Sequence, residues 1–145
     1  MSDYDWRMES NPLRLRRENL GLSLRDVGTA SGIPFPTLHR IERNVNGARV
    51  EHIAPLAKSL LMDEMWLYQA LSLYYELLVY ASAKDEFLAF QDAVLADLDA
   101  ARSIVERARA SVTPPRRSGE QVIQYRLLKL QKLLRAPGKS IPRED

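Results

Sequence analysis

Arginine is the residue type in this sequence with the most distinctive chemistry. It supplies 16 of the 21 basic side chains in a chain of 145 residues, against 19 acidic ones. The planar guanidinium holds its donors in a fixed fork that fits a phosphate group or a base edge better than the lysine ammonium does. The composition therefore favours contacts with phosphates or base edges.

The residue types that carry catalysis or bind metals are scarce. The sequence has no cysteine, which excludes thiolate nucleophiles, disulfides and cysteine-based zinc sites. His39 and His52 are the two histidines, too few for a metal cluster. No glycine-rich phosphate loop, GxSxG elbow, HExxH motif or paired-carboxylate pattern is present. We therefore expect no enzyme activity, no metal and no cofactor.

The charge is distributed unevenly, although the formal total is only +2. Residues 1–62 carry 9 basic and 7 acidic side chains, residues 63–112 carry 4 and 9, and residues 113–145 carry 8 and 3. Two basic ends therefore flank an acidic middle. The first ten residues lack the basic-then-apolar order of a signal peptide, so we expect a cytoplasmic protein.

Short helices separated by clear stop signals are predicted in the first part of the chain. Asn11 and Pro12 begin the first helix and Gly21 ends it. Ser23 and Asp26 have capping-box spacing at the start of the second. Each of these signals is local, and together they predict helices at about 12–20 and 24–31.

Prolines complicate the next two predicted helices. Because proline biases its predecessor away from the α conformation, we expect Phe35 to be a cap and Pro36 the first residue of a helix ending near Arg43. A fourth helix is predicted at about 49–61. Pro55 lies inside it, and should either kink it or move its start later.

The next predicted helix, over residues 65–83, is apolar on nearly every side. Its length would allow a membrane span, but Glu76, Gln69, two serines and four tyrosines interrupt it, so we expect protein to cover it and no membrane contact. No alternating strand pattern is present, and the predicted fold class is all-α.

Two apolar stripes follow at helical spacing. The first forms a near-heptad seam, through Phe87, Phe90, Val94, Leu98, Ala101, Val105 and Ala108. After a linker near 113–118, a basic helix to about Arg135 carries the second, through Ile123, Leu127, Leu130 and Leu134. Both patterns predict core packing, either within one chain or across a dimer.

The arrangement of the first helices is informative. Two helices joined by a tight turn that contains Gly32, then a polar loop and another helix, correspond to a helix-turn-helix. In that arrangement the first helix of the pair crosses the phosphate backbone and the second enters the major groove of DNA.

Residues 12–68 resemble the Xre/Cro-type, lambda-repressor-like helix-turn-helix regulators. The most specific parts are Arg17 before Gly-Leu-Ser, Gly32, the run that ends at Glu42, and Leu-Ala-x-x-Leu at 56–60. The resemblance implies that Arg17 pairs with Glu42. We expect a helix-turn-helix domain at residues 1–68, followed by long C-terminal helices at 69–145 for dimerisation or for a second DNA or partner contact.

The resemblance also indicates which residues contact double-stranded DNA. Its base-reading positions correspond to Phe35, Pro36, Thr37 and Arg40, and Arg40 could address guanine for about 1–3 kcal/mol of discrimination. His39 faces the groove or its edge and is either solvated or a phosphate contact. The loop that would follow the backbone contains Arg43, Asn44, Asn46 and Arg49.

Two functions are compatible with these residues. The first is a sequence-specific DNA-binding transcriptional regulator, a repressor from a bacterium or phage, acting as a homodimer through its C-terminal helices. The alternative is a protein-interaction module, an antitoxin-like protein or adaptor, whose C-terminal helices bind a protein partner. Apolar Leu24, Phe35 and Pro36 at expected contact positions support the alternative, and Phe35 could equally fill a gap between helices.

Overall fold

The computed structural model describes residues 5–112, and within that range the chain is helical with no strand. This confirms the all-α fold class. The predicted linker at 113–118 and the basic helix after it lie outside the described residues. The elements are η1 (Trp6–Ser10), α1 (Pro12–Asn19), α2 (Leu24–Ser31), α3 (Phe35–Glu42), α4 (Val50–Ser59), α5 (Glu64–Tyr80), α6 (Lys84–Ala93) and α7 (Leu98–Ala110).

The predicted caps set the limits of the first two α-helices. Asn11 accepts a hydrogen bond from the Leu13 amide, and Pro12 occupies the first turn of α1. Ser23 and Asp26 form a reciprocal capping box at the start of α2, with distances of 3.0 and 2.8 Å. Gly32 ends α2 at φ 78°, a left-handed conformation that glycine adopts without a steric penalty.

The predicted start of α3 needs correction, and one of the two alternatives for Pro55 is excluded. α3 begins at Phe35, with Pro34 as its cap, because the amides of Thr37 and Leu38 both donate to the Pro34 carbonyl. Pro36 then occupies the first turn, where no N–H is needed. α4 begins at Val50 and continues through Pro55, so the proline does not move its start later.

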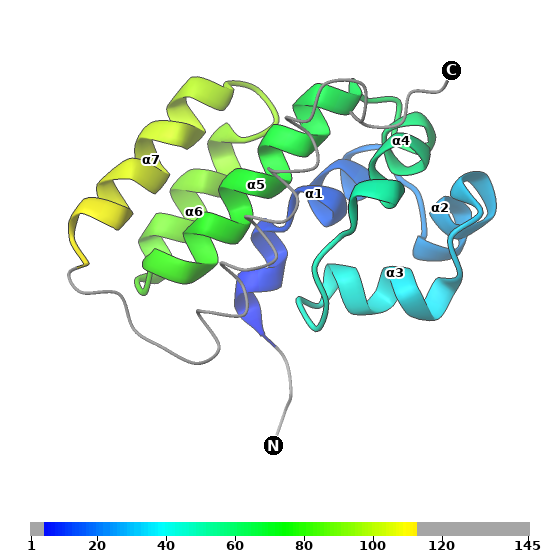
Figure 1. Ribbon diagram of the computed structural model, residues 1–145, viewed down its shortest axis with the longest axis horizontal. Helices are drawn as coiled ribbons and strands as arrows, with labels where there is room; N and C mark the ends of the chain where they lie inside the picture. Colours follow the sequence, from blue (N-terminus) through cyan, green and yellow to red (C-terminus); the bar gives the residue numbers. More distant parts are fainter. Residues whose placement is uncertain (1–4, 113–145) are drawn as a thin grey trace.

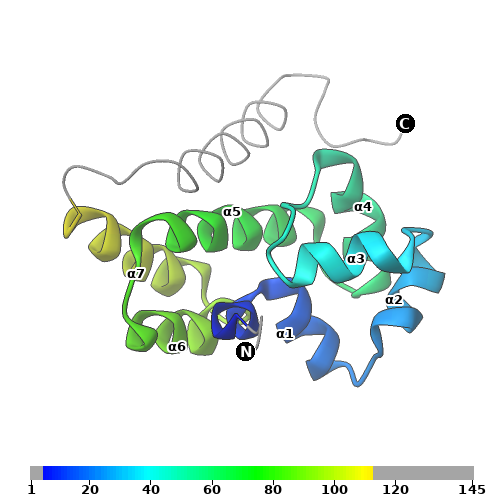
Figure 2. The ribbon, with the colours of Figure 1, turned by 90° about the horizontal axis from the view of Figure 1, so that it is seen from below.

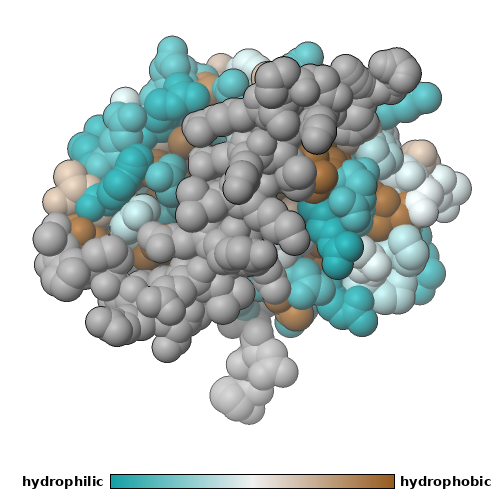
Figure 3. Space-filling model, in the orientation of Figure 1, coloured by the Kyte–Doolittle hydropathy of each residue, from teal (hydrophilic) through white to brown (hydrophobic). Residues whose placement is uncertain are grey.

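The stripe at 87–108 lies on two helices, where a single long seam was expected. The chain leaves the helix at Val94, and Asp97 caps α7 by accepting from the amides of Asp99 and Ala100. All stripe residues except the half-buried Leu98 are buried within this chain. The visible outer surface of α7 is mostly hydrophilic (Figure 3). The stripe is therefore the inner face of a helical layer.

Helix α5 occupies the centre of the molecule. It contacts α7 towards one end of the molecule and α1 and α4 towards the other (Figures 1 and 2). One continuous hydrophobic core extends from Leu13 on α1 to Ala108 on α7. The predicted boundary at residue 68 lies inside α5, and the division into two domains stays a prediction. Within residues 5–112, no helix has the length and apolar character needed to cross a membrane.

Phe90 provides a test of this core. Its side chain is fully buried against Tyr74 of α5, with 6.1 Å between ring centroids. We expect Phe90→Ala to lower the free energy of unfolding by about 3–5 kcal/mol through lost burial and a cavity. On the same helix, exposed Leu88→Ala should change it by less than about 0.5 kcal/mol. Chemical denaturation measures both variants, and equal losses would contradict the burial of Phe90 against Tyr74.

Candidate nucleic-acid interface

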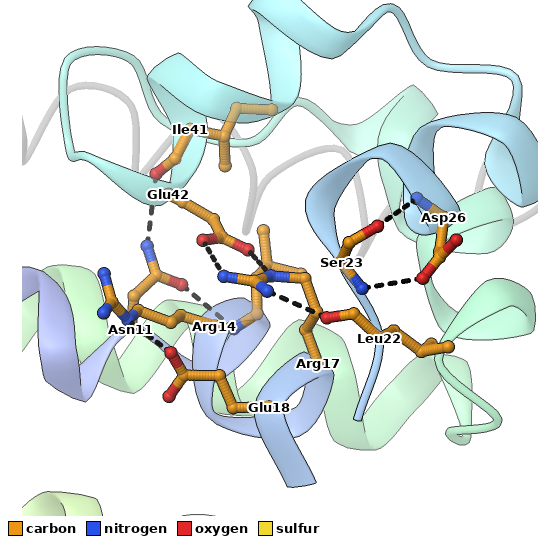
Figure 4. A network of polar contacts seen from close by, with 10 residues as sticks. Asn11, Arg14, Arg17, Glu18, Leu22, Ser23, Asp26, Ile41 and Glu42 are labelled. Carbon is orange, nitrogen blue, oxygen red and sulfur yellow. Dashed lines mark hydrogen bonds and ion pairs between the residues drawn. The ribbon is translucent and has the colours of Figure 1, made fainter. Parts of the chain in front are cut away.

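A buried ion pair fixes the end of the candidate recognition helix, α3. Arg17 of α1 donates to both carboxylate oxygens of Glu42, the last residue of α3, at 2.7 and 3.0 Å (Figure 4). It also donates to the Leu22 carbonyl at 2.9 Å. The hydrogen bond to Glu42 raises the pKa of Arg17, although burial opposes this. The structure thus confirms the pairing that the resemblance implied.

Asn11 fixes α3 from a second direction. Its side chain is fully buried, and its amide nitrogen donates to the Ile41 carbonyl at 3.1 Å (Figure 4). The same side chain caps α1 through its oxygen. Buried polar groups are costly unless hydrogen-bonded, so these bonds favour a single placement of α3 against α1.

One face of α3 is buried and the other is open to solvent. Leu38, Ile41 and Glu42 point into the protein. On the opposite side the predicted contact residues Pro36, His39 and Arg40 are exposed, whereas Phe35 and Thr37 are partly buried. Among residues 5–112, the one polar contact of the Arg40 side chain is a long one, 3.5 Å, with the Pro36 carbonyl of its own helix. Its guanidinium is therefore available to a ligand.

Arg25 of α2 joins this surface and was not among the residues predicted to contact DNA. Its guanidinium lies 4.4 Å from the ring centroid of Phe35, close enough for a cation–π contact. The same ring stacks on His39 at 5.8 Å. Phe35 thus contacts residues of α2 and α3 and holds an exposed arginine beside the start of α3. In the sequence, the aromatic residue between two prolines is a recognisable feature. Only the structure shows that a cation packs on its ring.

The loop after α3 contains predicted contacts in different environments. Arg49 is exposed and pairs loosely with Glu51 at 3.3 Å, and Arg43 is partly exposed at the end of α3. Asn44 instead makes internal contacts: its side-chain oxygen is 3.0 Å from the Tyr74 hydroxyl and 3.3 Å from the Asn11 amide nitrogen. The geometry therefore leaves the two arginines, and not Asn44, available for an external phosphate.

His52 caps α4 at the far end of this loop. Its Nδ1 accepts a hydrogen bond from the Arg49 amide at 3.1 Å, which requires that nitrogen to be unprotonated. Burial lowers the pKa of His52, the Arg49 charge lowers it further, and Glu51 opposes the shift. Among residues 5–112, no group of three or more potential ligands could hold a metal ion.

Helices α2 and α3, joined through Gly32, Ile33 and Pro34, have the geometry of a helix-turn-helix with an exposed second helix. A family model described as "Helix-turn-helix" matches residues 13–67. The matched segment coincides with the residues that resemble Xre/lambda-repressor-like helix-turn-helix regulators, and the match supports a DNA-binding helix-turn-helix regulator. No curated protein and no solved structure matches the chain.

Removing the buried carboxylate should be costly. Glu42→Ala leaves the Arg17 guanidinium without its anionic partner in a poorly solvated site, so we expect a loss of about 3 kcal/mol in the free energy of unfolding. The matched control is Glu18→Ala, which removes an exposed pair with Arg14 on the same helix and should cost about 0.3–0.5 kcal/mol. Denaturant titration compares them, and similar losses would show that the buried pair does not fix α3.

The cap at His52 predicts a pH dependence. As pH falls through 6.5, the ordinary histidine pKa, the unfolded chain takes up a proton before the folded chain does. Stability should therefore decline from neutral pH until the lower folded pKa is passed. Thermal denaturation across this range should show a weaker decline in His52→Gln, which keeps a capping side chain that does not titrate. His39 is present in both proteins, so identical pH profiles would argue against the cap.

Proposed function

We propose that this protein is a sequence-specific transcriptional repressor that inserts α3 into the major groove of double-stranded DNA. The observation that carries the proposal is the exposed Arg40 on a helix whose opposite face is fixed by Arg17–Glu42 and Asn11. A helix held rigidly from behind can present the same side chains to every binding site. The protein would repress transcription by occupying promoter DNA. We expect it to act in the cytoplasm.

Arg40 is the base-reading residue in this proposal. A guanidinium in the major groove donates to guanine O6 and N7 together, which discriminates guanine from other bases. Pro36 and Thr37 lie near the start of the same helix, where the threonine methyl or hydroxyl could meet a thymine methyl or a phosphate. Few polar groups are available, so Arg40 accounts for much of the specificity.

Arginines around α3 supply the phosphate contacts. Arg25 lies beside its start, Arg43 at its end, and Arg49 beyond the loop. Such contacts fix the register of the protein on DNA without reading sequence. Because each contact releases counterions, affinity should fall steeply as the salt concentration rises.

We also propose that two copies bind one operator, with recognition helices about 34–36 Å apart. The same chain already covers the apolar stripe at 87–108, so two copies would contact each other through a different surface. Leu61, 74% exposed, lies in the turn between α4 and α5, and Met65, 49% exposed, lies in the first turn of α5. Arg16 donates to the carbonyls of Leu60 and Leu61 and fixes that turn. This surface supports contact with a second copy.

Arg40→Ala tests the base-reading assignment. DNA is first selected with wild-type protein from a random pool, and binding to the selected and a scrambled duplex is then compared by gel shift. We expect Arg40→Ala to reduce discrimination by about 1–3 kcal/mol, roughly 5- to 150-fold. Exposed Arg102→Ala on α7 is the matched control and should leave discrimination unchanged.

Unchanged discrimination in folded Arg40→Ala would overturn the assignment of Arg40. The symmetry of the selected motif reports whether two copies bind. Absence of any saturable shift with wild-type protein at low and moderate salt would favour the protein-interaction module, for which the apolar Phe35 and Leu24 are the supporting features.

A further inference from the structure

Two adjacent tyrosines of α5 hold the loop that follows α3. The Tyr75 hydroxyl accepts a hydrogen bond from the buried Ala48 amide at 2.7 Å. The Tyr74 hydroxyl lies 3.0 Å from the side-chain oxygen of Asn44 and 2.9 Å from the Arg7 carbonyl. Both tyrosines are themselves buried. The loop is therefore attached to α5 near its start and near its end.

We propose that Tyr74 and Tyr75 are positioning residues that fix the loop at 43–49 in the shape required for contact with the DNA backbone. The proposal rests on the proposed function, since it concerns the same interface. It goes further by making the geometry of that interface depend on α5, most of which lies outside the helix-turn-helix segment at 13–67.

The conformation of Asn44 shows why an anchor is needed. Its φ of 63° places a non-glycine residue in the left-handed region, which persists where the surrounding contacts determine it. Those contacts are Tyr74 and Asn11 on its side-chain oxygen, with a longer one from its nitrogen to Asp5 at 3.5 Å. The turn at Asn44 sets the direction in which the chain leaves α3.

Tyr74 is suited to donate within this network. Burial raises the pKa of its hydroxyl, so the proton stays in place, and both neighbouring oxygens are acceptors. Through the Arg7 carbonyl, the same hydroxyl also contacts η1. Tyr74 thus brings together the N-terminal segment, the loop and α5.

Tyr75 holds the other end of the loop. Removing the Tyr75 hydroxyl would take this hydrogen-bond acceptor from the buried Ala48 amide, and a buried N–H needs an acceptor. Ala48 directly precedes Arg49, and Asn44 directly follows Arg43. The two tyrosine anchors therefore adjoin the two arginines proposed to contact phosphates.

Hydroxyl deletion in the full chain tests this arrangement. The variants are Tyr74→Phe and Tyr75→Phe, and Tyr80→Phe is the matched control on the same helix, where the ring lies near Arg109 of α7. The first measurement is amide hydrogen exchange at Ala48 by NMR, which needs no DNA. We expect Tyr75→Phe to raise that exchange rate about tenfold or more, with amides at the centre of α5 unchanged.

The second measurement is DNA affinity over a range of salt concentrations, on the duplex selected with wild-type protein. We expect Tyr74→Phe and Tyr75→Phe to weaken binding about tenfold and to reduce the slope of log affinity against log salt by about 0.9 for each lost phosphate contact. Discrimination against a duplex altered at the guanine read by Arg40 should be retained, because α3 itself stays fixed. A general loss of stability would instead weaken binding to both duplexes by the same factor and leave the salt slope unchanged, so a reduced slope separates the two cases.

The outcomes separate this proposal from the function on which it rests. If wild-type protein binds DNA and the two variants bind as tightly as Tyr80→Phe, the tyrosines do not position the interface. Unchanged exchange at Ala48 in Tyr75→Phe would overturn the anchor directly, with or without DNA. If wild-type protein shows no saturable binding, the proposed function fails, and the DNA role of the tyrosines fails with it.

Discussion

The ion pair between Arg17 and Glu42 determines where α3 lies. Removing two charges from water costs several kcal/mol for each ion, and their attraction offsets this only when the geometry is good and the remaining donors are satisfied. Here the guanidinium makes two bonds to the carboxylate and a third to the Leu22 carbonyl. The pair therefore meets the condition under which attraction offsets desolvation, and it joins α1 to the end of α3. The arrangement of Arg40 and of the loop after it depends on the orientation of α3.

Helix α5 provides the second constraint. Its side chains are buried at Leu71, Ser72, Leu73, Tyr74 and Tyr75 in succession, which covers every side of the helix. α1 and α4 pack on it from the helix-turn-helix segment, and α7 packs on it from the C-terminal layer. The hydrophobic core is therefore shared between the helix-turn-helix segment and the helices that follow it.

Features that depend on neighbouring residues could be predicted from the sequence. Caps at Asn11 and Ser23 and the turn at Gly32 are set by local hydrogen bonding and backbone freedom, and the structure has them where expected. The predicted start of α3 failed because a general bias was applied to a position where the Pro34 carbonyl receives the hydrogen bonds of the first turn. Leu38 and Ile41 are apolar and recur at helical spacing, so they could be predicted to face the core. The exposed face of α3 lies opposite to them.

Contacts between distant residues could not be predicted in the same way. The stripe at 87–108 has one periodicity, and only the cap at Asp97 divides it into two helices, of which α7 packs on α5 and α6 packs on α7. Asn44 resembles any polar loop residue until Tyr74, 30 positions away, is seen to contact it. The Arg17–Glu42 pair could be predicted because of the resemblance to a family. A family pattern implies contacts between residues that are far apart in the sequence, and residue spacing alone does not.

The start of α3 shows how these local and distant effects combine. Backbone amides at the start of a helix commonly attract phosphate. In α3, Pro36 has no N–H, and the amides of Thr37 and Leu38 donate to the Pro34 carbonyl. The prolines thus leave few backbone donors at this end of the helix. Arg25, held against the Phe35 ring, places a side-chain cation there instead. The aromatic residue that weakened the case for DNA binding in the sequence therefore helps to restore positive charge at the proposed interface.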